Sequence, residues 1–201
     1  MGGSLFKSTM NTRALDIKGW KLLVRSDCPE HITDVEIQWL KDNNVTTVID
    51  LRRKSEVEQH PCPLAFNENF DFHHIELSCK DGTPLTEREL EMEYLGMVDE
   101  KLAEVVNTIF AAKGNVLYYC FVGKDRTGIV TGVVLERLGV DRMDIIIDYM
   151  QSWANLEDFL IQYCKEHPES KIELLRPKKN YLLGAMDKFN HMFGSYDVRI
   201  E

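Results

Sequence analysis

Residues 115–139 read NVLYYCFVGKDRTGIVTGVVLERLG, a strand pattern, a polar loop and a helix pattern in direct succession. The first five residues predict a short strand. The apolar positions from Ile129 to Leu138 predict a central, buried helix, and Gly139 closes it. Strand, loop and helix in this order are typical of an α/β domain, in which ligands bind beyond the carboxyl ends of the strands.

Segments before this stretch extend the same pattern. Residues 45–51 are β-branched and almost continuously apolar, as expected of a buried parallel strand, and residues 70–77 are a second strand candidate. We therefore expect an α/β fold with a central, mostly parallel sheet flanked by helices. The chain has no internal repeat or long linker, so we expect a single domain over residues 1–201 and allow for disorder in residues 1–9.

Capping boxes predict two helix starts, at the TDVE of 33–36 and the TERE of 86–89. The first predicted helix is short and ends at two asparagines. The second is long, because apolar residues recur at a spacing of four as far as Ala112. Further helical patterns cover 141–151, 156–167 and 178–193.

The charge balance of the 201 residues narrows the possible partners. The chain has 33 acidic and 24 basic residues, which gives a net charge of −9. We expect no nucleic-acid partner, because phosphate contacts dominate such binding. No apolar run approaches the length of about 18 residues that a membrane span needs, and the first residues lack a signal peptide's apolar stretch. We expect no membrane span and a cytoplasmic location.

The loop after the strand has the residue types that bind an anion. Backbone N–H groups and a helix N-terminus favour negative charge there, and Gly123 permits a tight turn. The planar guanidinium of Arg126 matches two phosphate oxygens, and the same positive surroundings favour the thiolate of Cys120. These two residues form a CX5R loop that can wrap a phosphate or another oxyanion. Its expected substrate-binding residues are Phe121, Val122, Gly123, Lys124, Asp125 and Arg126.

Two other interpretations of this loop were considered. A P-loop of the nucleotide-binding type is excluded, because that motif needs a Gly at Tyr118 and a hydroxyl at Asp125. The ordinary alternative for Cys120 is a buried structural thiol.

The remaining cysteines and histidines give weaker indications. The five cysteines lack metal-type pairing, and His73 and His74 point to opposite faces of a strand, so we expect no metal site. Cys79 is a candidate for a protective disulfide with Cys120 if their loops meet.

The segment CFVGKDRTG at 120–128 resembles the signature of cysteine-dependent protein-tyrosine phosphatases. More narrowly, it is similar to an atypical bacterial group that includes tyrosine/serine and phosphoinositide phosphatases. The chain departs from the family at Tyr119, where a His usually stands, and a phenol supplies no cation beside the sulfur. Shorter similar segments, in the group's order, are NTR at 11–13, VRS at 24–26, IDLR at 49–52, DYM at 148–150 and FGSY at 193–196.

The resemblance implies a protein-tyrosine-phosphatase-like fold and hydrolysis of phosphomonoesters without a metal or cofactor. Cys120 would attack phosphorus and form a phosphocysteine intermediate, which water then hydrolyses. Arg126 and the loop amides would hold the equatorial oxygens. Thr127 would donate a hydrogen bond to the sulfur as it leaves, although its position also suits a helix N-cap.

Two aspartates are candidates for the general acid that protonates the leaving group. Asp81 follows the 70–77 strand in a polar loop, where the bacterial group places a candidate acid. An ordinary turn aspartate explains Asp81 equally well. Asp125 lies inside the signature loop, where related lipid phosphatases use an acid. The sequence leaves the choice open.

Two cations bear on the substrate. Lys124 suits a second phosphate on an inositol ring; alternatively it only adds positive charge or pairs with an acid. Arg52, at the end of its strand, either faces the same pocket and binds substrate or forms an ion pair. The expected substrates are phosphotyrosine or phosphoserine/threonine proteins, as for dual-specificity phosphatases, or a phosphoinositide.

Two rival functions use the same loop. In a non-catalytic phospho-ligand binding module, the loop would capture phosphate while Tyr119 blunts the nucleophile. A rhodanese-like sulfurtransferase also places a cysteine at the base of an anion loop. The Arg-Thr-Gly continuation at 126–128 and the two candidate aspartates favour phosphate-ester chemistry.

Overall fold

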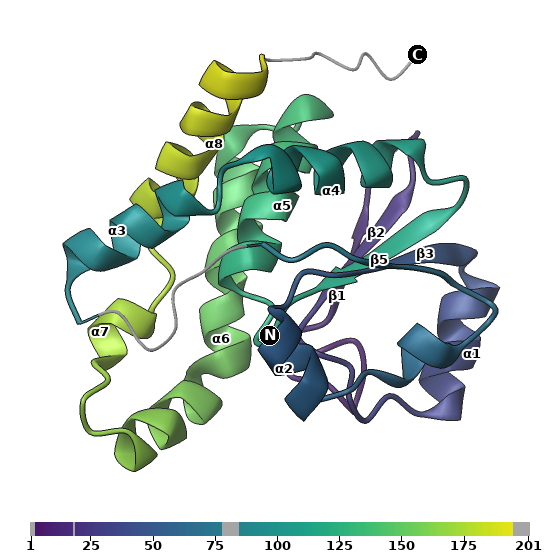
Figure 1. The fold of residues 1–201 in the computed structure, drawn as a ribbon, viewed down its shortest axis with the longest axis horizontal. Coiled ribbons are helices and arrows are strands. Elements are labelled where there is room, and N and C mark those ends of the chain that lie inside the picture. The colour runs from purple at the N-terminus through teal and green to yellow at the C-terminus, as the bar shows by residue number, and fades with distance from the viewer. Residues whose placement is uncertain (1–2, 18, 78–84, 195–201) are drawn as a thin grey trace.

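The structure is a computed structural model that describes residues 3–17, 19–77 and 85–194. Within these ranges five strands form one sheet, and helices pack on both of its faces (Figure 1). The order across the sheet is β1-β2-β5-β3-β4. The strands are β1 (Arg13–Asp16), β2 (Leu22–Ser26), β3 (Val45–Asp50), β4 (Asp71–His74) and β5 (Asn115–Tyr119).

The middle strand, β5, is parallel to both of its neighbours, β2 and β3. The β3–β4 pair is also parallel, and β1 alone among the described strands pairs antiparallel. The expected mostly parallel sheet is therefore confirmed. Tyr119 lies opposite Ser26 of β2 and Asp50 of β3, so three carboxyl ends meet where the 120–128 segment begins.

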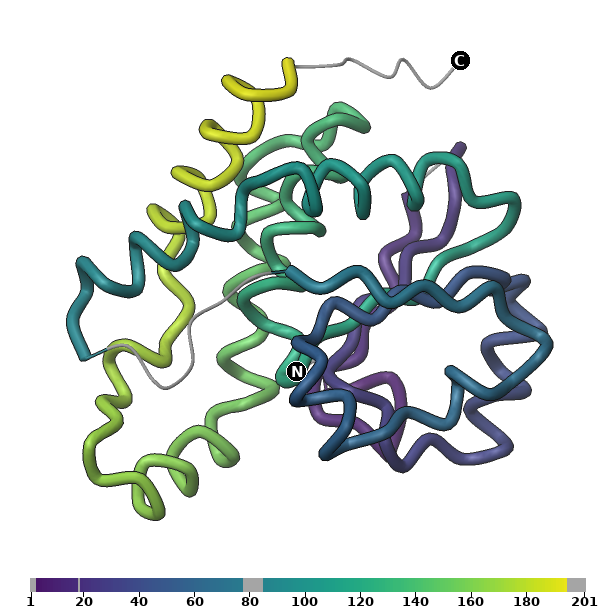
Figure 2. The backbone as a smooth tube through the Cα atoms, in the orientation of Figure 1, coloured from purple at the N-terminus to yellow at the C-terminus, as the bar shows by residue number. Residues whose placement is uncertain are grey.

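Helices fill the rest of the described chain. Thr33 accepts from the backbone N–H of Glu36, and the Glu36 carboxylate accepts from that of Thr33, so the first capping box is confirmed. The last helix packs against α3 and α5 (Figure 2). The α-helices are α1 (Asp34–Asp42), α2 (Lys54–Gln59), α3 (Glu87–Gly96), α4 (Glu100–Ala111), α5 (Asp125–Arg137), α6 (Arg142–Glu166), α7 (Ile172–Leu175) and α8 (Lys179–Phe193), with a 3-10 turn at Pro63–Phe66.

The helix that begins within the signature loop, α5, is largely enclosed. All its residues from Arg126 to Leu135 are buried. Gly128 and Gly132 allow neighbouring helices to approach it closely. A Cβ on Gly128 would lie 2.8 Å from the Tyr149 ring of α6. The expected buried central helix is confirmed.

Three predicted element boundaries were wrong. The pattern at 86–112 forms two helices, because Asp99 caps α4 by accepting from two backbone N–H groups. The patterns at 141–151 and 156–167 form one helix, since the SWAN sequence between them contains no Gly or Pro. The strand predicted at 70–77 ends at His74. Beyond it, the backbone N–H of Ile75 donates to the Asp50 carbonyl of β3, and that of Leu77 donates to the Leu51 carbonyl.

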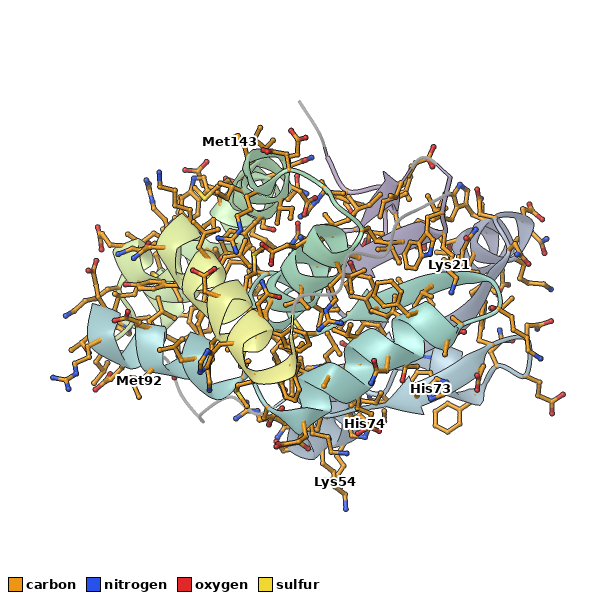
Figure 3. All side chains as sticks on the ribbon, turned by 90° about the horizontal axis from the view of Figure 1, so that it is seen from above. Lys21, Lys54, His73, His74, Met92 and Met143 are labelled. Atoms are coloured by element: carbon orange, nitrogen blue, oxygen red, sulfur yellow. The ribbon has the colours of Figure 1, made fainter. Side chains whose placement is uncertain are left out.

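The N-terminal segment contributes to the core. Phe6, within the region where disorder was allowed for, is only 3% exposed and packs in the cluster beneath the sheet with α1. His73 and His74 lie on the edge strand β4 (Figure 3). Among the described residues, no three side chains suited to metal binding cluster together. No helix in the same ranges combines the length and apolar character that crossing a membrane requires.

Candidate active site

The signature loop runs from the end of β5 into the first turn of α5. Gly123 has a φ of 68°, and a Cβ at this position would lie 2.5 Å from the backbone nitrogen of Asp27. Only glycine combines that left-handed conformation with so close an approach. The tight turn expected at this residue is present.

The side chains of Asn11 and Arg25 donate hydrogen bonds to backbone carbonyls of the loop. The Asn11 amide donates to the carbonyls of Val122, at 3.1 Å, and Gly123, at 3.0 Å. Arg25 donates to the Gly123 carbonyl at 2.9 Å. In a trans peptide the following N–H points away from the carbonyl. The N–H groups of Gly123 and Lys124 therefore face the opposite side, as an anion site requires.

A buried ion-pair cluster around Asp148 includes Arg25, and its other member, Arg13, donates to the side-chain oxygen of Asn11. Arg13 donates to the Asp148 carboxylate at 2.9 Å, and Arg25 pairs with the other oxygen of the same group. Burial alone would raise the pKa of Asp148, but the two guanidinium groups hold it below its usual value. The similar segments at 11–13, 24–26 and 148–150 are thus brought together behind the loop.

Of the three residues expected to carry the chemistry, Cys120 directly follows β5, and Arg126 and Thr127 lie in the first turn of α5. Cys120 is 1% exposed and Thr127 is fully buried. The Thr127 hydroxyl has no hydrogen-bond partner within the described residues. A buried hydroxyl without a partner is costly, so its position calls for an explanation, which a bound ligand or a reaction step would supply.

Arg126 is held by a residue that the sequence analysis missed. Both terminal nitrogens of Arg126 donate to the Glu56 carboxylate of α2, at 2.6 and 2.8 Å. Burial would raise the pKa of Glu56, but the bonds from Arg126 lower it to about 2. Glu56 lies near Arg53 in the sequence, and that spacing indicates only a local helix pair. No sequence signal connects it to Arg126.

Five loop residues line a cavity of about 400 Å³, namely Phe121, Val122, Lys124, Asp125 and Arg126, whereas Cys120, Gly123 and Thr127 are not among its lining residues. Helices α2, α3, α6 and α7 supply its walls, and much of the wall surface is apolar. Phe121 stands 37% exposed and packs edge-on against His60 at 5.4 Å between ring centroids. The apolar wall residues include Leu90, Met97, Phe159, Leu160 and Leu174.

Asp125 and Lys124 both line this cavity. The Asp125 carboxylate accepts from the Tyr94 hydroxyl, and its Oδ1 lies 3.5 Å from Nζ of Lys124. Lys124 is 4% exposed, and its ammonium donates to the Leu175 carbonyl of α7. Of the two interpretations of Lys124, the structure contains the pairing with an acid.

Arg52 lies elsewhere. It is fully buried and donates to both oxygens of Asp50, one of them at 2.7 Å. Within the described residues, Arg53 lines the cavity and Arg52 does not. The ion pair is therefore the interpretation of Arg52 that the structure contains, because its strand end turns it toward Asp50.

Tyr119 donates to the same Asp50 carboxylate at 2.9 Å. Burial raises the pKa of this phenol, so it remains a neutral donor. Burial also raises the pKa of Cys28 to about 12 and that of Cys62 above its usual value. Those two thiols are therefore unreactive at neutral pH. Asp81 and Cys79 lie outside the described residues.

Comparison with solved structures defines the class of fold. The human tyrosine phosphatase-like serine/threonine/tyrosine-interacting protein matches with a TM-score of 0.50 at 12% identity, over 90% of this chain and 96% of that one. The expected protein-tyrosine-phosphatase-like fold is thereby confirmed.

The family follows from the sequence. The profile of the tyrosine phosphatase family matches residues 9–198, so this chain belongs to that family. A tyrosine-protein phosphatase of Nostoc commune is 32% identical over an aligned length of 136 residues, and the match covers 63% of this chain and 46% of that protein. The triple specificity protein phosphatase PtpB of Mycobacterium tuberculosis is 53% identical over 47 residues, 23% of this chain and 17% of that protein. The matches thus span less than half the length of either relative.

Proposed function

We propose that this chain hydrolyses phosphomonoesters through a phosphocysteine on Cys120. The observation that carries the proposal is the buried Thr127 hydroxyl, which has no partner among the described residues and directly follows Arg126, a residue that lines the cavity. A structural thiol would not need this constellation. Membership of the tyrosine phosphatase family supports the same reaction class.

In the first step, the Cys120 thiolate attacks phosphorus and forms an S–P bond while the ester P–O bond breaks. The leaving oxygen takes a proton from a nearby acid. Arg126 and the loop N–H groups stabilise the equatorial oxygens, whose charge is redistributed in the transition state. These groups supply the positive charge that the reaction needs, so the proposed mechanism has no metal and no cofactor.

In the second step, water attacks phosphorus and the S–P bond breaks. The same acid, now ionised, takes the proton from water. The Thr127 hydroxyl donates to the departing thiolate, which gives this residue the partner that it lacks in the resting structure. Inorganic phosphate then leaves the loop.

The cavity favours an aryl phosphate as substrate. Its volume of about 400 Å³ and its apolar walls suit the ring of phosphotyrosine. Lys124 and Arg53 also line it and are the cations that a second phosphate, as in a phosphoinositide, would meet. Phosphoserine offers less apolar surface to these walls, so we place phosphotyrosine proteins first.

The test is hydrolysis of p-nitrophenyl phosphate with EDTA under reducing conditions. We expect activity in the wild type and its loss in Cys120→Ser, with an unchanged circular dichroism spectrum. Cys28→Ser is the matched control, because that thiol is half-buried and its pKa, raised to about 12, keeps it protonated. Phosphate binding without hydrolysis from pH 5 to 8 would instead identify a non-catalytic binding module.

A further inference from the structure

Two tyrosines from separate helices form a chain of hydrogen bonds that ends at Asp125. Tyr94 of α3 donates its hydroxyl hydrogen to Oδ1 of Asp125, and the same hydroxyl oxygen is bonded to the Tyr149 hydroxyl of α6. Because a phenol has one hydrogen to donate, Tyr149 is the donor to Tyr94. The result is one directed chain of hydrogen bonds that ends on the carboxylate.

The packing around the two rings holds this chain in place. Tyr94 and Tyr149 are 2% and 1% exposed. The Tyr149 ring occupies the space above Gly128, where a Cβ would lie 2.8 Å from it. The Tyr94 ring packs against Tyr181 at 5.7 Å between centroids. Burial raises the pKa of both bonded phenols, so they stay protonated as donors.

The two carboxylate oxygens of Asp125 differ in their hydrogen-bond partners. Oδ1 accepts from Tyr94 and lies 3.5 Å from Nζ of Lys124. Oδ2 has no hydrogen-bond partner among the residues that the structure describes. Asp125 also lines the cavity above the phosphate loop. One oxygen is thus anchored, and the other is available to a leaving group.

We propose that Asp125 is the proton donor of the reaction, and that Tyr94 and Tyr149 are positioning residues that anchor its Oδ1. This inference rests on the proposed function. As the P–O bond breaks and the S–P bond forms, the proton on Oδ2 moves to the leaving oxygen. The carboxylate that remains accepts a charge-assisted bond from Tyr94, which is stronger than the bond to the neutral acid. The tyrosine pair therefore favours the transfer itself.

The experiment compares Tyr94→Phe with the wild type on two substrates. Phenyl phosphate has a poor leaving group that needs the proton, and p-nitrophenyl phosphate has a good one that does not. We expect kcat to fall about tenfold on phenyl phosphate and less than about twofold on p-nitrophenyl phosphate, with KM unchanged on both. Tyr149→Phe is an independent second variant with a smaller loss in the same direction.

Tyr181→Phe is the matched control, since it removes a hydroxyl from the neighbouring ring and leaves the chain of bonds intact. A double-mutant cycle adds a second readout. In an Asp125→Asn background, Tyr94→Phe should cause no further loss, because the tyrosine acts through the carboxylate.

Equal losses on both substrates, or a full additional loss in the Asp125→Asn background, would overturn the inference and leave the proposed function standing. If the wild type is active and both Tyr94→Phe and Tyr149→Phe keep full activity, the inference is likewise overturned and the proposed function still stands. Absence of Cys120-dependent hydrolysis in the wild type would overturn both proposals together.

Discussion

The guanidinium of Arg126 binds the Glu56 carboxylate in the structure, and we propose that it also binds the phosphate of the substrate. Glu56 accepts from both terminal nitrogens and fixes the plane of the group. A fixed plane gives the guanidinium a defined orientation toward the phosphate oxygens. Glu56 therefore contributes to the proposed reaction without touching the reacting atoms, and its effect is on orientation.

Replacing Glu56 by Gln tests that orientation. The amide keeps the shape of the side chain but loses the charge and one acceptor, so Arg126 is held less firmly. Hydrogen bonds to charged groups contribute about 1.5–3 kcal/mol, from which we expect kcat/KM to fall by about tenfold or more. Steady-state kinetics on p-nitrophenyl phosphate measure this. Glu58→Gln on the same helix is the control, because that side chain is 67% exposed. A variant with full activity would show that Glu56 does not position Arg126.

The same residue gives a pH dependence of stability. The pKa of Glu56 is lowered from 4.5 to about 2 in the folded chain. A lowered pKa contributes stability above the unfolded value, and this contribution is lost as pH falls from 4.5 toward 2. Urea unfolding at several pH values should show that the free energy of unfolding falls more steeply with decreasing pH in the wild type than in Glu56→Gln. The same pH dependence of the free energy of unfolding in both proteins would contradict the lowered pKa of Glu56.

At the scale of the elements, close contact between helices fixes the back of the site. The phosphate loop leads into the first turn of α5. From α6, the Tyr149 ring packs against Gly128 of α5, and Asp148 forms an ion pair with Arg25. The two glycines of α5 are not equivalent. A Cβ on Gly128 would meet a rigid aromatic ring at 2.8 Å, whereas one on Gly132 would meet the flexible thioether of Met186 at 2.9 Å.

This difference predicts the outcome of two alanine substitutions. We expect Gly128→Ala to lower the free energy of unfolding by about 1–3 kcal/mol, as overpacking does, and Gly132→Ala to lower it less. Gly184→Ala in α8 is the control, because only a leucine methyl at 4.0 Å lies near its added Cβ. Chemical denaturation measures all three. Equal losses at Gly128 and Gly132 would contradict the packing account.

At the scale of the whole molecule, the sequence predicted the fold class and the loop because both depend on local patterns. The apolar β5 sequence and the apolar α5 sequence could be buried only in a layered α/β arrangement. The break at Asp99 was missed, since a regular apolar spacing continues through it and only the cap interrupts the helix.

The parts of the site that sequence reasoning missed are long-range contacts. Glu56 with Arg126, and Tyr94 with Asp125, join residues far apart in the chain, and no local pattern reports such pairs. The Arg52 ion pair could be proposed from sequence but not chosen, because the choice depends on where the end of β3 directs the side chain.

The central claim is the covalent intermediate on Cys120, and trapping it is the most direct test. Thr127→Ala removes the hydroxyl proposed to assist the departing thiolate, so the second step should slow and phosphocysteine should accumulate. After acid quench of Thr127→Ala with p-nitrophenyl phosphate, we expect mass spectrometry to find one phosphate on the peptide that contains Cys120, and none in Cys120→Ser. Phosphate on another residue, or continued turnover by Cys120→Ser, would contradict the account.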